Sequence, residues 1–447
     1  MSSLIMDVID NQLRHDRFLV HVFVRDGVSI NGLAISRLLG GEMVNPNNPR
    51  QIIQVPPHYP RAIDIKCYSH TADLCAADCK ERGRTVGRLK GPNLRIFENH
   101  LNSLFSGSSK APKNQWAQEM GSAFPSHSAT RWWSIEEVHE YTLEHMYVTE
   151  NRLVTLTDFV KAHYQNDDFT GVHMTYLYNT LVSKIGEEVN PTYEESNFAH
   201  LIVELAVSVD VSKPIRELTY ILEGDSCISL IVTDVVNRAN LYLQDHWHTM
   251  DFVNVRRAIA LNVEANVRPN GYDAIDSIEQ AWIQYCKDTS ERCINYFTNE
   301  IINHPASGTM QAAALANPDY MRRFPKSAAE TREIIQPLVG RLITAAHLDN
   351  MIRELTDYKL QCTADWSVLE YSDQLQKIIS FWSLIRKLPA WRKFAHLCYL
   401  LQVSSASVER AFSLLKYIYG DQETTCKQDL IEGKLMLRYN RRQQRET

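Results

Sequence analysis

Residues 18–30 read FLVHVFVRDGVSI, and this stretch decides the fold class of the N-terminal part of the chain. Residues 18–24 contain one polar interruption, and a short apolar run that ends at a turn is typical of a strand buried on both faces. The turn is the dipeptide Asp26-Gly27. Ser29 can cap a helix that follows. The apolar residues of that helix recur at helical spacing: Ile30, Leu33, Ala34 and Leu38. Strand, turn and helix together predict the beginning of an α/β sheet.

A second strand is predicted at residues 63–67, where apolar and charged side chains alternate. Another helix is predicted after Ser69. Residues 45–60, which are rich in Asn and Pro, are predicted to be a loop, and the glycines and serines of residues 80–130 predict a loop-rich segment. Residues 1–80 are therefore expected to form part of an α/β sheet.

Residues 135–400 show mostly helical periodicity. Ile275, Ile278, Trp282 and Tyr285, for example, follow one another at intervals of three, four and three residues. No repeat of fixed period indicates a solenoid. The predicted fold class is an α/β remnant plus a large α-helical part.

The composition is that of an ordinary globular protein, with 44% hydrophobic and 22% charged residues among 447 and a formal net charge of −6. This excludes a uniformly cationic nucleic-acid coat but not a local basic groove. Nine cysteines without dense spacing do not suit a disulfide scaffold. The N-terminus does not resemble a signal peptide and the apolar runs are too short to cross a bilayer. We therefore expect a soluble intracellular chain with no membrane partner.

The C-terminal part contains the most informative stretch. Residues 404–413 read SSASVERAFS, and residues 435–440 read LMLRYN. One helical stripe runs through this part: Val408, Ala411, Phe412, Leu415 and Tyr419. Taken alone, the stripe predicts a core helix with Glu409 and Arg410 in its solvated first turn, where the helix dipole favours a carboxylate.

The same residues resemble the C-terminal signature of hAT-family transposases. Shared features are the Ser-Ser-Ala start, the Glu-Arg pair, the Phe-Ser, the closing helix and the preceding segment LPAWRKFAHLCYLL at residues 388–401. The resemblance covers nearly the whole chain from about residue 15. It implies an RNase H-like core interrupted by an all-α insertion, and a C-terminal region that dimerises and completes the core. The implied parts are a partial core at 1–134, a helical insertion at 135–365 and the dimerisation region at 366–447.

The resemblance also implies a site. Asp26 matches the second catalytic Asp, and Glu409 matches the third acidic metal ligand. In an active enzyme these carboxylates would hold Mg²⁺, which prefers carboxylate oxygens. Residues matching the nucleic-acid-binding positions or the wall of the active site are Cys67, His70, Trp132 and Arg410.

One departure from the family bears on activity. The family's first catalytic Asp lies on a strand upstream of the second, and only 25 residues precede Asp26 here. Asp7, Asp10 and Asp16 are too close in sequence to fill that role. Loss of one carboxylate costs orders of magnitude in rate, so we expect impaired catalysis. The expected function is self-association as a homodimer or higher oligomer with DNA binding in second place, in the nucleus or otherwise the cytoplasm.

Other interpretations remain open. The chain could be a metal-dependent DNA transposase or endonuclease, or a helical scaffold for protein partners without nucleic acid. Asp26-Gly27 is first of all a turn, and Trp132 suits core packing as well as base stacking. Cys67, His70, Cys75 and Cys79 contain the ligand types of a zinc site, but no second Cys-x₂-Cys accompanies them. Buried free cysteines are common.

Overall fold

The structure, a computed structural model, describes residues 22–25, 35, 38–45, 48–56, 59, 61–78, 92–106, 111–125, 134–148, 154–165, 171–182, 191–224 and 227–406. These residues are mostly helical, with small sheets near the N-terminal end. The chain forms two compact units. Unit 1 comprises residues 1–71, 219–236 and 304–447, and unit 2 comprises residues 72–218 and 237–303. The division into 1–134, 135–365 and 366–447 is drawn on a different basis and stays a prediction.

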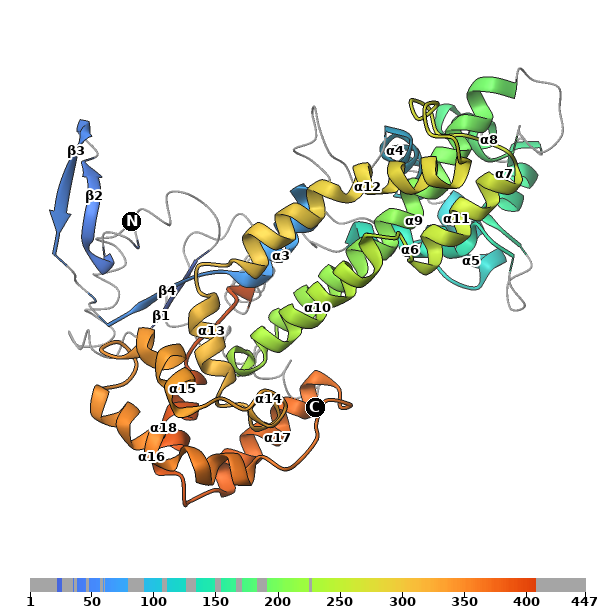
Figure 1. The fold of residues 1–447 in the computed structure, drawn as a ribbon. Helices are drawn as coiled ribbons and strands as arrows, with labels where there is room; N and C mark the ends of the chain where they lie inside the picture. Colours follow the sequence, from blue (N-terminus) through green and yellow to red (C-terminus); the bar gives the residue numbers. More distant parts are fainter. Residues whose placement is uncertain are drawn as a thin grey trace, which may run out of the picture. The chain divides into compact units, whose positions relative to one another are not determined.

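A small parallel sheet lies in unit 1 (Figure 1). Strand β1 (Val22–Arg25) pairs with β4 (Ile63–Lys66), with Val22 opposite Ile63 and Arg25 opposite Lys66. In β4 the apolar residues Ile63 and Ile65 are buried, whereas the charged residues between and after them are partly exposed. Both predicted strands are therefore present, and the expectation of a small α/β part beside a large helical part is confirmed.

An apolar cluster packs against this sheet. Its buried members are Ile35, Leu38, Tyr59 and Ala62, and Phe23 of β1 lies against them. The rings of Phe23 and Tyr59 meet edge to face with centroids 5.3 Å apart, an arrangement that aromatic pairs prefer. The predicted helix after β1 thus supplies Ile35 and Leu38 to the core of the sheet.

The prediction of a loop at residues 45–60 is wrong in its first part. Strands β2 (Gly41–Asn45) and β3 (Asn48–Val55) form an antiparallel pair in which Asn45 lies opposite Asn48. Asn45 and Asn48 lie at the end of this pair, and residues of this type are favoured at turns. The chain enters β2 through Gly40 and Gly41, whose φ angles of 76° and 108° suit glycine.

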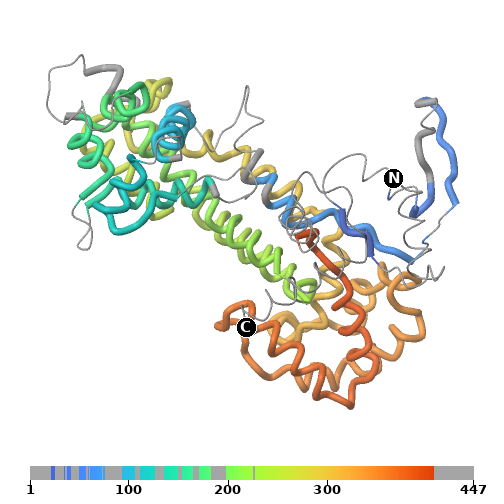
Figure 2. The backbone as a smooth tube through the Cα atoms, turned by 180° about the vertical axis from the view of Figure 1, so that it is seen from behind, coloured from blue at the N-terminus to red at the C-terminus, as the bar shows by residue number. Residues whose placement is uncertain are grey.

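Several helices belong to unit 1 and can be followed along the chain in Figure 2. They are η2 (Ile228–Leu230), α13 (Ser307–Ala314), α14 (Pro318–Arg323), α15 (Ala328–Ile335), η4 (Gln336–Leu338), α16 (Ala345–Gln361), α17 (Tyr371–Leu384) and α18 (Pro389–Cys398). Tyr358, Trp382 and Trp391 are fully buried. Each donates a hydrogen bond to a backbone carbonyl, at 2.9, 2.7 and 2.8 Å respectively. Buried aromatic residues whose polar atoms are satisfied contribute strongly to stability.

The regular secondary structure in the described residues of unit 2 is all helical. Its helices are α4 (Pro92–Ser106), α5 (Ala111–Met120), α6 (Ser134–His145), α7 (Leu156–Gln165), α8 (Val172–Leu181), α11 (Val253–Glu264), α12 (Ile278–Tyr296) and the π-helical turn η3 (Phe297–Ile302). Three further helices are divided between the units: α3 (Tyr68–Asp78), α9 (Pro191–Leu222) and α10 (Val232–Trp247). Residues 199–212 of α9 are all buried, as expected of a helix that is apolar on nearly every side.

Aromatic packing also fixes the core of unit 2. The ring of Trp116 on α5 contacts Phe105, Phe124 and Phe159, with centroids 5.0 to 5.5 Å apart. Its indole nitrogen donates to the hydroxyl of Tyr141 at 2.8 Å. The cluster joins α4, α5, α6 and α7.

Candidate functional site

Two of the predicted site residues, Cys67 and His70, lie at the end of the parallel sheet. Cys67 follows β4 directly, and its amide donates to the carbonyl of Arg25 at 2.6 Å, which continues the pairing with β1. The Arg25 guanidinium binds the Asp64 carboxylate through Nε and a terminal nitrogen, at 2.9 to 3.1 Å. This bidentate pair joins the two strands across the sheet.

The start of the SSASVERAFS stretch lies against the same residues. The amide of Tyr68 donates to the carbonyl of Val403 at 2.9 Å. The hydroxyls of Ser69 and Ser404 are 2.7 Å apart. Ser405 donates to the Cys67 sulfur from its amide at 3.3 Å and from its hydroxyl at 3.4 Å. Residues more than 330 positions apart in sequence therefore meet at Cys67.

Cys67 and His70 are positioned by the start of α3. The Cys67 sulfur accepts from the amide of His70 at 3.4 Å, and its carbonyl accepts from the Thr71 hydroxyl at 2.8 Å. Cys67 is fully buried, and His70 is partly exposed. The sulfur thus helps to cap the helix and to hold residues 404–405, which accounts for a cysteine here without a metal.

A histidine that the sequence did not single out lies beside this junction. The ring of His304 stacks on Tyr68 with centroids 3.6 Å apart and 27° between the planes. Its Nδ1 accepts from the amide of Ala306 at 3.1 Å. The pKa of His304 is lowered to about 3, first by burial and then by the charges of Lys66 and Arg25, while a hydrogen bond with the Lys66 backbone opposes the shift. Burial raises the pKa of Tyr68. A neutral, buried imidazole therefore packs next to the ends of β1 and β4.

Four of the predicted site residues lie outside the described residues. They are Asp26, Trp132, Glu409 and Arg410. Their described neighbours in the chain include Arg25, which binds Cys67 through its carbonyl, and Ala406, whose amide donates to the Ser404 hydroxyl at 3.0 Å. The roles of Asp26 and Glu409 as catalytic residues and as metal ligands stay predictions.

A buried Ser-His-Glu group in unit 2 was also not foreseen. His139 of α6 contacts the Ser208 hydroxyl through Nδ1 at 2.7 Å and the Glu98 carboxylate through Nε2. These residue types also form hydrolytic triads. All three residues are 4% exposed or less, so no substrate can reach the serine. The group is a satisfied polar network between α4, α6 and α9.

The stretch AAALANPDYM at residues 312–321 contains the start of α14. The Asn317 side chain caps α14 by accepting from the amides of Asp319 and Tyr320 at 3.0 and 3.4 Å. The buried Asp319 carboxylate binds Arg322 and Arg323 at 3.0 and 2.9 Å. Cap and ion pairs hold α14 in the core of unit 1.

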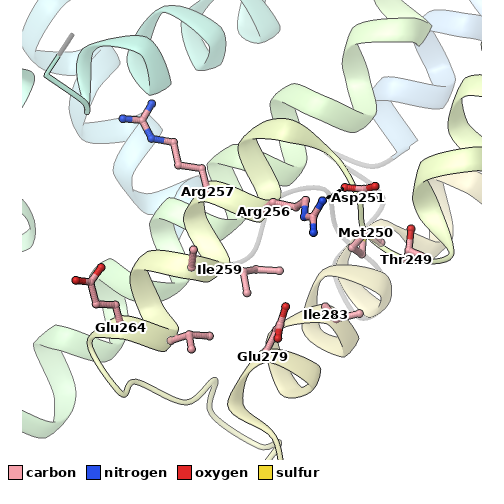
Figure 3. Close-up of a pocket in the computed structure, with 11 residues that line it drawn as sticks. Thr249, Met250, Asp251, Arg256, Arg257, Ile259, Glu264, Glu279 and Ile283 are labelled. Carbon is pink, nitrogen blue, oxygen red and sulfur yellow. Dashed lines mark hydrogen bonds and ion pairs between the residues drawn. The ribbon is translucent and has the colours of Figure 1, made fainter.

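A pocket of 710 Å³ lies between α11 and the first part of α12 in unit 2 (Figure 3). Apolar side chains, among them Ile259 and Ile283, line part of it. At one end Arg256 donates to the Asp251 carboxylate at 2.6 Å, and both side chains are largely exposed. None of the residues predicted from the sequence lines this pocket.

Two further findings concern the described residues alone. Within them, no group of three or more His, Cys, Asp or Glu side chains has the arrangement of a metal site. Nor does any helix there combine the length and the hydropathy that a bilayer-spanning segment requires.

Comparison with known proteins adds no relative. No model of a known protein family matches the chain, and no curated protein matches it either.

Proposed function

We propose that the chain is a transposon-derived protein that resembles a hAT transposase and acts through self-association, with DNA binding as a second activity. The observation that carries this proposal is the junction at Cys67. The resemblance implies a C-terminal region that completes the core, and here the start of that region lies at the carboxyl ends of two parallel strands. The Cys67 amide donates to the Arg25 carbonyl at 2.6 Å, and Ser405 donates to the Cys67 sulfur at 3.3 to 3.4 Å.

The strand order is compatible with a partial RNase H-like core. Such a core contains two parallel strands with helical residues between them in the sequence. In this chain the strands are β1 and β4, and the residues between them in the sequence that pack against the sheet are Ile35 and Leu38. The hairpin β2–β3 is an addition to that unit.

Two exposed apolar side chains in the described part of 366–447 allow self-association through this region to be tested. Val368 is 87% exposed and Leu384 at the end of α17 is 80% exposed. Single exposed apolar residues are normal on a monomer, whereas a dimer interface would cover them. The two residues therefore make a direct test of the proposed region.

Sedimentation velocity of the purified chain at micromolar concentration tests the proposal. We expect the wild type to sediment as a dimer or larger oligomer, and the double variant Val368→Glu, Leu384→Glu to shift toward the monomer. Val253→Glu is the matched control, because Val253 is 82% exposed but lies on α11 in unit 2. A wild-type monomer at this concentration would refute self-association.

DNA binding is tested by fluorescence anisotropy at several salt concentrations. Contact with phosphates makes log Kd vary linearly with log salt, with a slope of about 0.9 for each phosphate neutralised. The helical scaffold would be favoured instead if the chain does not bind DNA and if its affinity for protein partners is independent of salt.

A second candidate function, a metal-dependent endonuclease, rests on the same junction. Its donors would be the Asp26 and Glu409 carboxylates, because the described side chains around Cys67 are thiol, hydroxyl and imidazole groups, which suit Mg²⁺ poorly. Mg²⁺ or Mn²⁺ would supply charge stabilisation for phosphodiester cleavage.

Nicking of supercoiled plasmid in Mg²⁺ or Mn²⁺ distinguishes the two candidates. The endonuclease predicts nicking that disappears in Glu409→Gln and persists in Glu264→Gln, an exposed carboxylate of unit 2. No nicking by the wild type under either metal would leave self-association as the function.

A further inference from the structure

Two histidines face each other between α4 and α8 in unit 2. The Nδ1 atoms of His100 and His173 are 3.1 Å apart. The His100 ring stacks on Tyr176, with centroids 4.0 Å apart and 10° between the planes, and this contact fixes its orientation. Both histidines are partly exposed, so water and ions can reach their nitrogens.

The separation of these nitrogens matches the spacing of two ligands on one metal ion. Imidazole nitrogens bind Zn²⁺ at about 2.0–2.1 Å, so two of them lie about 2.9 Å apart at a right angle and about 3.3 Å apart at the tetrahedral angle. We propose that His100 and His173 bind a divalent transition-metal ion, Zn²⁺ above all, through their Nδ1 atoms, with water as the remaining ligands.

The chemistry of the surroundings suits such a cation. Imidazole is a ligand for Zn²⁺, Cu²⁺ and Ni²⁺ rather than for Mg²⁺, so this site is distinct from the predicted carboxylates. Binding requires neutral rings, and burial together with the nearby His173 lowers the pKa of His100. Helix α8 contains no Lys or Arg, and the one Arg of α4 is accompanied by an acidic residue.

The consequence would be a metal clip between two helices. In the metal-free chain one ring donates to the other, and this bond is lost when both rings bind the ion. The ion instead joins α4 to α8, so it stabilises unit 2 by mass action. The effect depends on the folded arrangement, because the two residues are 73 positions apart in sequence.

Isothermal titration of the full chain with Zn²⁺ tests the proposal. His100→Asn and His173→Asn are each expected to remove one equivalent of Zn²⁺, or to weaken its binding at least about tenfold. They should also abolish the rise in thermal midpoint that Zn²⁺ produces in the wild type. His248→Gln is the matched control, because His248 is exposed and lies directly after α10 in the same unit.

A measurement on the wild type alone guards against variants that fail to fold. Diethyl pyrocarbonate modifies accessible imidazoles, and mass spectrometry locates the modified residues. Zn²⁺ should protect His100 and His173 together and leave His248 reactive. Unchanged titration in both Asn variants, or equal reactivity of His100 and His173 with and without Zn²⁺, would overturn the assignment.

Discussion

Replacing Ser404 by alanine is expected to loosen the contact between the C-terminal segment and the end of β4. The Ser404 hydroxyl is 2.7 Å from the hydroxyl of Ser69 and accepts from the amide of Ala406 at 3.0 Å. The substitution removes both hydrogen bonds and adds no bulk, so the remaining contacts of the segment keep their geometry.

The size of the effect follows from these two bonds. A hydrogen bond contributes a net 0.5–1.5 kcal/mol or so, so loss of two costs about 1–3 kcal/mol. A value near 2 kcal/mol raises the population of the locally opened state by about 30-fold. The Ser69 hydroxyl keeps a partner in the Cys67 sulfur at 3.2 Å, whereas the amide of the buried Ala406 loses the acceptor that Ser404 supplies.

Hydrogen exchange measured by mass spectrometry reports on this opening. The Tyr68 amide donates to the carbonyl of Val403 at 2.9 Å, so it exchanges only when residues 403–406 move away. We expect its exchange to be about 30-fold faster in Ser404→Ala. Ser383→Ala is the control, because that exposed hydroxyl donates only to a carbonyl of its own helix.

Equal exchange of Tyr68 in Ser404→Ala, Ser383→Ala and the wild type would refute the reasoning. It would mean that residues 403–406 are held by other contacts, and that the pair of serine hydroxyls adds nothing to the junction on which the proposed function depends.

Three more predictions concern the stability of unit 1, measured by urea unfolding. Asp319→Asn should lower the free energy of unfolding by about 1.5–3 kcal/mol, because the buried carboxylate loses its charge-assisted hydrogen bonds to Arg322 and Arg323, which keep Asp365 and Asp234 as partners, whereas Asp349→Asn in an exposed ion pair should cost less than about 1 kcal/mol. His304, with a pKa of about 3 in the folded chain and an ordinary value of 6.5, takes up a proton first in the unfolded chain as pH falls through 6.5, so stability should drop by about 1.4 kcal/mol per unit between pH 6 and 5. His304→Asn should remove that slope, and an unchanged slope would contradict the assignment. Glu354→Ala should cost about 1–2 kcal/mol, since the carboxylate caps the first amides of α18 at 3.0 to 3.2 Å.

Local patterns sufficed for the parallel sheet and for the helices after residue 135, but not for α4 and α5, which lie in the segment 80–130 that was predicted to be loop-rich. The run at 18–24 and the alternation at 63–67 each predict a strand without reference to any partner; β1 overlaps the first at residues 22–24, and β4 lies within the second. The hairpin β2–β3 was missed because its strands are short and largely exposed where described, with Ile52 66% exposed. Such strands lack the apolar alternation by which a half-buried strand is identified.

The junction at Cys67 could be predicted only in part. The resemblance to a known signature singled out Cys67, His70 and the Ser-Ser stretch, but no local pattern shows that a thiol will accept from residue 405. His304 was missed for a similar reason. It is one histidine between helices, and its burial against Tyr68 depends on packing between segments more than 200 positions apart.

The contact between Ser69 and Ser404 also determines when this part of the nascent chain can complete its folding. These two residues are separated by 335 positions, and ribosomes add about 5–20 residues per second. Ser404 is therefore synthesised about 20–70 s after Ser69, and the contact between their hydroxyls can form only then. During translation the end of β4 must remain without its final neighbour, so chaperone occupancy of this edge until release from the ribosome is the expected consequence.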